Sequence, residues 1–128
     1  MHDIDSILEM LDWNCSQDIQ SEGLRLAMIV KCVNVFIQPG TPYGKRVWDN
    51  CAKIIASKSD EVIQHYLPDL FEWVQDLNWP GAIVIKNRLM QYQGANYSYW
   101  LDYCYKCAIA TSDEVWAETL DSMRIHGK

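Results

Sequence analysis

The chain has 128 residues, a length typical of one domain with its own hydrophobic core. Its formal net charge of −6 argues against a nucleic-acid partner, because nucleic-acid binders need a basic surface. No apolar run approaches the roughly 18 residues of a membrane span, no signal-peptide pattern opens the chain, and its five cysteines favour free thiols in a reducing cytoplasm.

The first third of the chain predicts two helices followed by an irregular loop. Residues 4–12 suit a short helix, and residues 16–32 suit a longer one with apolar residues at helical spacing. Residues 33–44 contain two prolines and two glycines, which interrupt regular structure, and we expect them to form the main loop.

A helix, a short turn and a second helix are predicted next. Apolar residues recur at steps of three and four from Val47 to Ile55, the spacing of an amphipathic helix. Ser59 is expected to cap the following helix by accepting a backbone N–H bond, and the helical spacing continues to Leu77. Pro68 predicts a fresh helical segment, because proline suits a first turn and disrupts a helix interior.

The segment 76–94 is predicted to form a central helix. Asn78 is the expected start and Gly94 the expected stop. The mostly β-branched run 82–85 also suits a short strand, but no second strand candidate lies nearby to pair with it. Helix is therefore the preferred interpretation.

Part of the chain repeats at an offset of 53 residues. Residues 47–67 align without a gap with residues 100–120, and eight of the 21 aligned pairs are identical, including the four letters Ser-Asp-Glu-Val at 59–62 and 112–115. The second copy thus predicts helix, turn and helix again, with Ser112 in the capping position. Repetition on this scale is typical of stacked helical units.

These elements predict an all-α fold of about seven helices in one domain. The expected organisation is a partial repeat at 1–32, a loop at 33–44, a full unit at 45–94 and a partial repeat at 95–124. Short turns between helices favour a HEAT- or armadillo-like α-α superhelix, with a compact helical bundle as the alternative.

The pair Cys104 and Cys107 is the most suggestive chemical motif. A C-x-x-C pair can bind zinc or form a redox couple, but it supplies only two of four zinc ligands. Because Cys104 aligns with Cys51 on the apolar stripe of the first copy, we expect both thiols to face the core. No catalytic or nucleotide-binding motif is present, so the sequence predicts no catalytic residues, no metal and no cofactor.

The candidate binding site is the corner around Trp79. No Lys or Arg occurs from residue 59 to 85, which makes this part of the chain acidic. A tryptophan with polar and acidic neighbours has the composition of an interface anchor, although it also suits a staple between two helices. A second corner is expected at Asp12 and Trp13, and Asn50 is expected to line the same groove. The predicted partner-binding residues are Trp79, Asp76, Asn78, Glu72, Trp13, Asp12 and Asn50.

Several stretches resemble a small bacterial family of all-helical, HEAT-like domains of unknown function. The most specific is E-W-V-Q-D-L-N-W-P-G-A at 72–82, supported by L-D-W-N at 11–14 and by 47–55. The resemblance covers most of residues 8–92, with little beyond residue 95. It implies an all-helical fold and no established activity, so it brings no catalytic residues.

Together these features predict a non-enzymatic protein-interaction module. The most concrete hypothesis is an immunity-like or inhibitory protein whose acidic face covers a basic protein, such as a nuclease toxin. The alternatives are a small-molecule-binding regulator or enzyme with a pocket formed by Trp79, Trp73, Asp76 and Asn50, and a structural domain of a larger assembly.

Overall fold

A computed structural model describes residues 3–38 and 43–124. Within these ranges the chain is helical and has no strand, which confirms the predicted all-α class. The α-helices are α1 (Ile4–Met10), α2 (Gln17–Ala27), α3 (Trp48–Ala56), α4 (Asp60–Ile63), α5 (Leu67–Trp73), α6 (Ala82–Gln91), α7 (Tyr97–Ala110) and α8 (Glu114–Ser122). Three 3₁₀ segments complete them: η1 (Val33–Phe36), η2 (Lys45–Val47) and η3 (Gln64–Tyr66). Helices α4 and α5 are joined by η3 without a gap. Counted as one helical segment, they give seven helical segments in the described chain, which is the predicted number.

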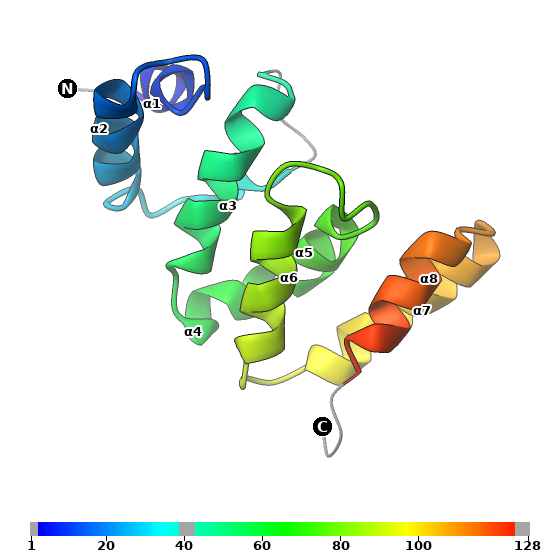
Figure 1. The fold of residues 1–128 in the computed structure, drawn as a ribbon. Helices are drawn as coiled ribbons and strands as arrows, with labels where there is room; N and C mark the ends of the chain where they lie inside the picture. The colour runs from blue at the N-terminus through cyan, green and yellow to red at the C-terminus, as the bar shows by residue number, and fades with distance from the viewer. Residues whose placement is uncertain (1–2, 39–42, 125–128) are drawn as a thin grey trace.

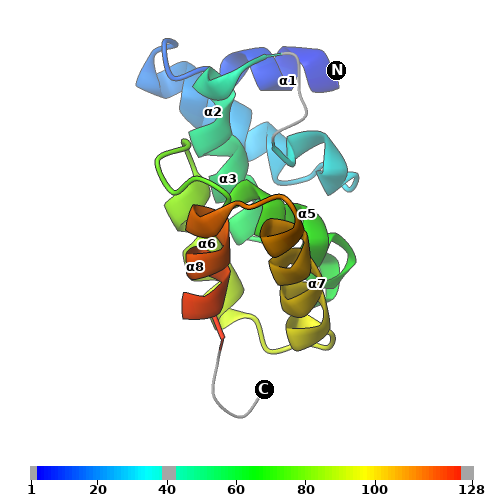
Figure 2. The same ribbon diagram turned by 90° about the vertical axis from the view of Figure 1, so that its right-hand side faces the viewer.

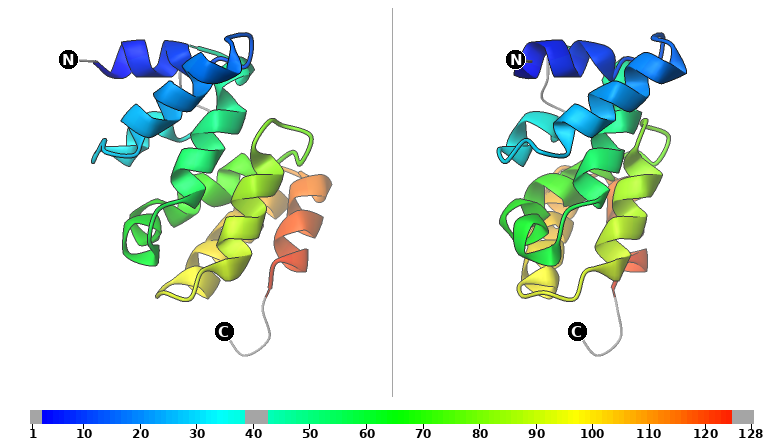
Figure 3. Two further views of the ribbon diagram at one scale, coloured as in Figure 1. Left: turned by 60° about the vertical axis from the view of Figure 1, so that its left-hand side comes forward. Right: turned by 90° about the vertical axis from the view of Figure 1, so that its left-hand side faces the viewer.

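The helices follow one another from one end of the molecule to the other. The pair α1–α2 lies at one end, and α3, α5 and α6 form the middle (Figure 1, Figure 3). The pair α7–α8 lies side by side at the other end (Figure 2). Helix α3 packs on α6, α5 packs on both α6 and α7, and α7 packs on α8. A HEAT- or armadillo-like superhelix stays a prediction.

Some helices begin with a side chain that accepts a hydrogen bond from a free backbone N–H group, but the capping residues differ from the predicted ones. Ser59 occupies the N-cap of α4, yet its side chain makes no capping bond. In the second copy Asp113 caps α8 by accepting from the Trp116 N–H at 3.0 Å. Ser112, the predicted cap, instead has a φ of +58° in the turn before it. The prediction was therefore wrong by one residue, because the turn needs a left-handed residue ahead of the cap.

Several helix boundaries differ from their predicted positions. Helix α2 ends at Ala27 rather than residue 32, and the predicted loop 33–44 contains η1, while its residues 39–42 lie outside the described residues. Pro68 lies in the first turn of α5, as predicted. Helix α6 is helical through the run 82–85, but it begins after Gly81 rather than at Asn78 and ends at Gln91, before Gly94.

The start of α6 is set by close packing at Gly81. This glycine has a φ of +80°, and a Cβ atom there would lie 2.6 Å from the Cβ of Ala52 and 2.8 Å from the Trp48 carbonyl oxygen. Only glycine allows the loop to come this close to α3 in this conformation. The loop before α6 is thereby held against the start of α3.

The core is apolar, and some of its buried side chains donate hydrogen bonds to helix ends. The largest fully buried side chains include Trp73, Tyr92, Phe36 and Phe71. Helices leave carbonyl groups unsatisfied in their last turn. The Tyr97 hydroxyl donates to the Met123 carbonyl at the end of α8, and the Trp116 indole donates to the Phe71 carbonyl in α5. The second of these bonds fixes the start of α8, which forms part of the candidate site.

Two of the five cysteines are core residues. Cys51 and Cys104 are buried, as predicted, and burial raises the pKa of each thiol to about 12. Cys107 is half-buried, so it faces the core only in part. A thiol with so high a pKa is a poor nucleophile at neutral pH, because the thiolate is the reactive form.

Candidate functional site

The predicted corner around Trp79 is a compact turn between α5 and α6. The Asp76 carboxylate accepts the backbone N–H of Asn78 at 2.8 Å, and the Asp76 carbonyl accepts the N–H of Trp79 at 3.0 Å. Side chains of aspartate commonly close such turns by bonding two residues ahead. This turn presents Asp76, Asn78 and Trp79 at the surface, with Trp79 half-buried.

One face of Trp79 stabilises the fold. Its ring meets Trp48 edge to face, with centroids 5.5 Å apart, and Trp48 in turn meets Trp73 at 6.2 Å. The Lys45 amine lies 6.0 Å from the Trp79 ring centroid and 5.8 Å from that of Trp48. The Trp73 indole donates to the Pro80 carbonyl at 3.2 Å. The tryptophan therefore holds the turn against α3, so the staple interpretation describes this part of its role.

The remaining surface of the turn forms one wall of an open groove. The other wall is the start of α8, and this part of the groove has a volume of about 430 Å³. Its lining residues are Gln75, Asp76, Asn78, Trp79, Asp113 and Val115. An adjoining hollow of about 680 Å³ shares three of these residues and extends over the α7–α8 turn. We call the two hollows together the acidic groove; its further lining residues are Thr111, Ser112, Glu114 and Trp116.

Two hydrogen bonds hold the α8 wall in place. The Trp116 indole donates to the Phe71 carbonyl at 3.0 Å, which ties the first turn of α8 to α5. Asp113 holds the same turn through its capping bond to the Trp116 N–H. The buried Trp116 and the capping residue Asp113 thus hold the wall. The exposed side chains of Glu114 and Val115 extend from it.

The groove carries negative charge around an apolar surface. Asp76, Asp113 and Glu114 line it, and neither lining set contains Lys or Arg. Val115, with 65% of its surface exposed, and the free side of Trp79 supply the apolar part. Such a surface suits a positively charged side chain with an aliphatic stem, because the stem packs on apolar atoms while the charge meets carboxylates.

The second predicted corner lies beside the first but outside the groove. The Asp12 carboxylate accepts the Asn14 N–H at 2.8 Å and pairs with Arg46 at 3.0 Å. The Trp13 N–H donates to the Arg46 carbonyl at 2.9 Å, and the ring is 47% exposed. Because Trp79 meets Trp48 just beyond this segment, both corners flank the start of α3. Neither Asp12 nor Trp13 lines the acidic groove.

Two other predicted residues lie elsewhere. Asn50 is only 4% exposed; its amide donates to the Leu11 carbonyl at 2.8 Å and to the Gln20 side chain at 2.9 Å, so it closes the end of α1 rather than lining a groove. This correction also removes the alternative pocket of Trp79, Trp73, Asp76 and Asn50, because Trp73 too is fully buried. Glu72 is exposed on α5 but does not line the acidic groove.

The sequence prediction missed the α8 wall of the groove. Asp113, Glu114 and Val115 belong to the repeated Ser-Asp-Glu-Val stretch, which was interpreted as a helix start alone. The repeat therefore drew attention to these acidic residues but not to their place in a groove. The proximity of Asp113 to Asp76 depends on how α5, α7 and α8 pack, and the spacing of residues along the chain does not contain this information.

Within the described residues, no three or more His, Cys, Asp or Glu side chains lie close enough together to hold a metal ion. No described helix combines the length and apolarity needed to cross a membrane. The lining of the acidic groove offers carboxylates, amides, hydroxyls and two indoles. These groups are suited to binding a cation by charge and packing.

A comparison with protein families gives one match over residues 44–123, to a family described as Domain of unknown function (DUF5071). The match covers α3 to α8, including both walls of the acidic groove. It differs in extent from the resemblance drawn from the sequence, because it omits α1 and α2 and continues through α8. No curated protein and no solved structure matches the chain.

Proposed function

We propose that this chain, which belongs to the DUF5071 family, is a non-enzymatic protein-interaction module whose acidic groove binds a basic partner protein. The observation that carries the proposal is the groove itself. It joins an indole and an exposed valine to three carboxylates, and no Lys or Arg lines it. Interface hot spots commonly combine an aromatic anchor with a polar surround.

The charge of the whole chain supports a basic partner. The net charge is −6, and the stretch from residue 59 to 85 contains no Lys or Arg. Such a field attracts a basic protein over distance and raises the rate of association, more so at low salt. We therefore propose an immunity-like or inhibitory role, in which the chain covers a basic surface such as that of a nuclease toxin.

The five cysteines support a reducing compartment as the place of action. Every one of them is a free thiol, and Cys32 is exposed. Free exposed thiols persist in a cytoplasm, where glutathione and thioredoxin keep them reduced. We propose a cytoplasmic location on this ground.

The groove can be tested with variants that remove charge and keep the fold. Asp76→Asn preserves the bond to the Asn78 N–H, and Asp113→Asn preserves the α8 cap, because asparagine caps helices as well as aspartate. Glu114→Gln completes a triple variant with similar helix propensity. Tagged wild-type and variant protein are incubated with a lysate of the source cell, and retained proteins are quantified by mass spectrometry.

We expect the triple variant to retain its partner about tenfold less, the sum of three modest charge contributions. The control carries the same charge change on exposed acids that do not line the groove: Glu9→Gln, Asp18→Asn and Asp49→Asn. Equal loss in both variants would point to net charge alone. Unchanged retention by the groove variant would refute the proposal.

A further inference from the structure

Helix α7 has an uncovered side that is largely apolar. It lies at one end of the molecule and packs mainly on α5 and α8 (Figure 2). Of its 14 residues only Asp102 and Lys106 are charged, and aromatic or aliphatic residues occur on every side of the helix. A helix of this composition is usually covered on every side. Its exposed residues nevertheless include Tyr99, Tyr103 and Ile109, with 64%, 52% and 56% of their surface exposed.

Helical spacing gathers both charged residues and both exposed tyrosines on one side of α7. At about 100° per residue, four exposed residues fall within roughly a third of the circumference: Tyr99, Asp102, Tyr103 and Lys106. Ala108, which is fully buried, lies on the opposite side. We call these four exposed residues the outer face of α7.

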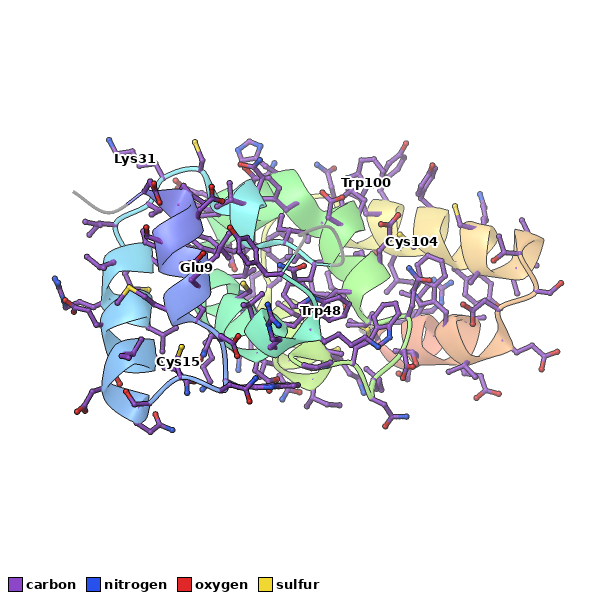
Figure 4. All side chains as sticks on the ribbon, turned by 90° about the horizontal axis from the view of Figure 1, so that it is seen from above. Glu9, Cys15, Lys31, Trp48, Trp100 and Cys104 are labelled. Atoms are coloured by element: carbon purple, nitrogen blue, oxygen red, sulfur yellow. The ribbon has the colours of Figure 1, made fainter. Side chains whose placement is uncertain are left out.

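The ring of Trp100 orders the two tyrosines of the outer face. It meets Tyr99 at a centroid distance of 5.0 Å and Tyr103 at 5.4 Å, both edge to face. Figure 4 shows Trp100 toward the outer edge of the molecule, with Cys104 one turn further on and nearer the neighbouring helices. Because the rings are already held by one another, less conformational entropy is lost when the face is covered.

The internal repeat indicates what kind of element covers such a face. Tyr103 aligns with Asn50 of α3 at the offset of 53 residues. In α3 this position is buried beneath the α1–α2 pair, where the Asn50 amide donates to the Leu11 carbonyl at 2.8 Å and to the Gln20 side chain at 2.9 Å. No described helix buries Tyr103 in this way. Since stacked helical units bury such faces against a neighbouring unit, a further helix is expected over the outer face.

We propose that a second copy of this chain covers the outer face, with the two α7 helices antiparallel and Tyr103 close to the two-fold axis. Lys106 is in no salt bridge with a described residue. In this arrangement it lies about 3 Å along the axis from Asp102 of the second copy, and about 1.5 Å along the axis from Tyr99 of the second copy. Its ammonium group therefore meets a carboxylate and an aromatic ring.

Charge complementarity favours a second copy in this orientation. The outer face carries one basic and one acidic residue, and a two-fold axis pairs each with the opposite charge of the other copy. In a parallel pair the two Lys106 side chains would lie at the same level and repel each other. Arg124 donates to the Asp102 carboxylate at 2.6 Å and holds it in place for the contact.

The outer face is separate from the acidic groove, because none of its four residues lines either hollow of the groove. A dimer formed through α7 would therefore carry two grooves, each built within one copy. The inference goes beyond the proposed function and does not depend on it.

The first experiment measures the mass of the full chain by sedimentation velocity and light scattering, at concentrations from about 10 µM to 1 mM. One helix face per copy makes a small interface, so we expect a weak dimer with a dissociation constant of about 0.1 mM. The mass should rise from 14.9 kDa toward twice that value. Tyr103→Ser should raise the dissociation constant about tenfold, because it removes the ring at the centre of the contact.

The second experiment reverses the charges. Lys106→Asp places a carboxylate opposite Asp102 of the second copy, and Asp102→Lys places an ammonium group opposite Lys106, so each should weaken the dimer about tenfold. An equimolar mixture of the two variants should recover association, because the mixed dimer again pairs opposite charges at both positions. The control is Lys53→Asp, the same change at the aligned exposed position of α3, which should leave association unchanged.

Circular dichroism establishes that each variant is folded. A wild-type chain that stays monomeric up to about 1 mM would overturn the inference, and so would a dimer that Tyr103→Ser and Lys106→Asp leave unchanged. A mixture that fails to recover association would exclude the antiparallel pairing, and a mass above that of a dimer would exclude a closed two-fold contact. Partner retention by the acidic groove is measured separately, so either proposal can fail while the other stands.

Discussion

The indole N–H of Trp116 lies 3.0 Å from the carbonyl oxygen of Phe71, 45 residues earlier in the chain. Phe71 lies in the last turn of α5, where carbonyl groups lack helical partners. One side chain of α8 therefore both closes α5 and fixes the position of the α8 wall of the acidic groove. Stability and the shape of the groove depend on the same bond.

The first prediction concerns this bond. Trp116→Phe removes the donor and leaves a buried carbonyl unpaired, which should lower the free energy of unfolding by about 1–3 kcal/mol beyond the effect of the smaller ring. Urea unfolding followed by far-UV circular dichroism measures it. Trp48→Phe is a matched control, because Trp48 is equally buried at 6% exposure and its indole N–H is buried without a hydrogen-bond partner in the described structure. Because Trp48 also packs edge to face on Trp73 and Trp79, its loss gives an upper limit for the effect of the smaller ring. A loss below about 1 kcal/mol in Trp116→Phe would show that the Trp116 bond contributes nothing.

The second prediction concerns Gly81, behind the Trp79 turn. Gly81→Ala places a Cβ atom against Ala52 and the Trp48 carbonyl and requires alanine at a φ of +80°. The left-handed conformation and the overpacking together should lower the free energy of unfolding by roughly 2–4 kcal/mol. Thermal and urea unfolding check the value. A loss below about 1 kcal/mol would mean that the loop moves away from α3 to make room.

The third prediction concerns the turn before α8. Ser112 has a φ of +58°, a conformation that glycine adopts without steric cost. Ser112→Gly should therefore raise the free energy of unfolding by up to about 1 kcal/mol. If Ser112 were the cap of α8, as the repeat suggested, the same change would instead lower it by a few tenths of a kcal/mol. The sign of the change in urea midpoint distinguishes the two arrangements.

The outcome at Ser112 shows what the sequence could predict and where it failed. The repeat correctly predicted helix, turn and helix at 100–120, because helical spacing and capping residues are local signals. The choice between Ser112 and Asp113 as the cap depends on the backbone angle of the turn, and both residue types make good caps.

Part of the candidate site was likewise predictable from the sequence, and part was not. The turn at Asp76, Asn78 and Trp79 was predictable, because its residues are neighbours in the chain and its composition is that of a turn. The role of Asn50 was not, since its partner Leu11 lies 39 residues away and an asparagine in an amphipathic helix suits either face. The opposite wall at Asp113 likewise depends on the packing of α8 against α5. Contacts between distant segments decide these positions.

The final prediction concerns the pH dependence of stability at Glu72. Although Glu72 is exposed, partial desolvation against its neighbours, and then the charge of Asp69, raise the pKa of Glu72 in the folded protein. The folded state thus holds this proton to a higher pH than the unfolded state does, so ionisation of Glu72 lowers stability as the pH rises through the folded pKa. Its place near the C-terminal end of α5 acts in the same direction, because the helix dipole disfavours negative charge there.

Glu72→Gln should therefore raise the free energy of unfolding at pH 7, and this gain should disappear as the pH falls below about 4, where the glutamate of the unfolded chain is also protonated. The gain should be smaller in an Asp69→Asn background, because one of the two causes of the shift is then removed. Urea unfolding across this pH range measures both effects, with Glu118→Gln on the exposed side of α8 as the control. A loss of stability at pH 7 would mean that the Glu72 carboxylate has a cationic neighbour in the folded protein.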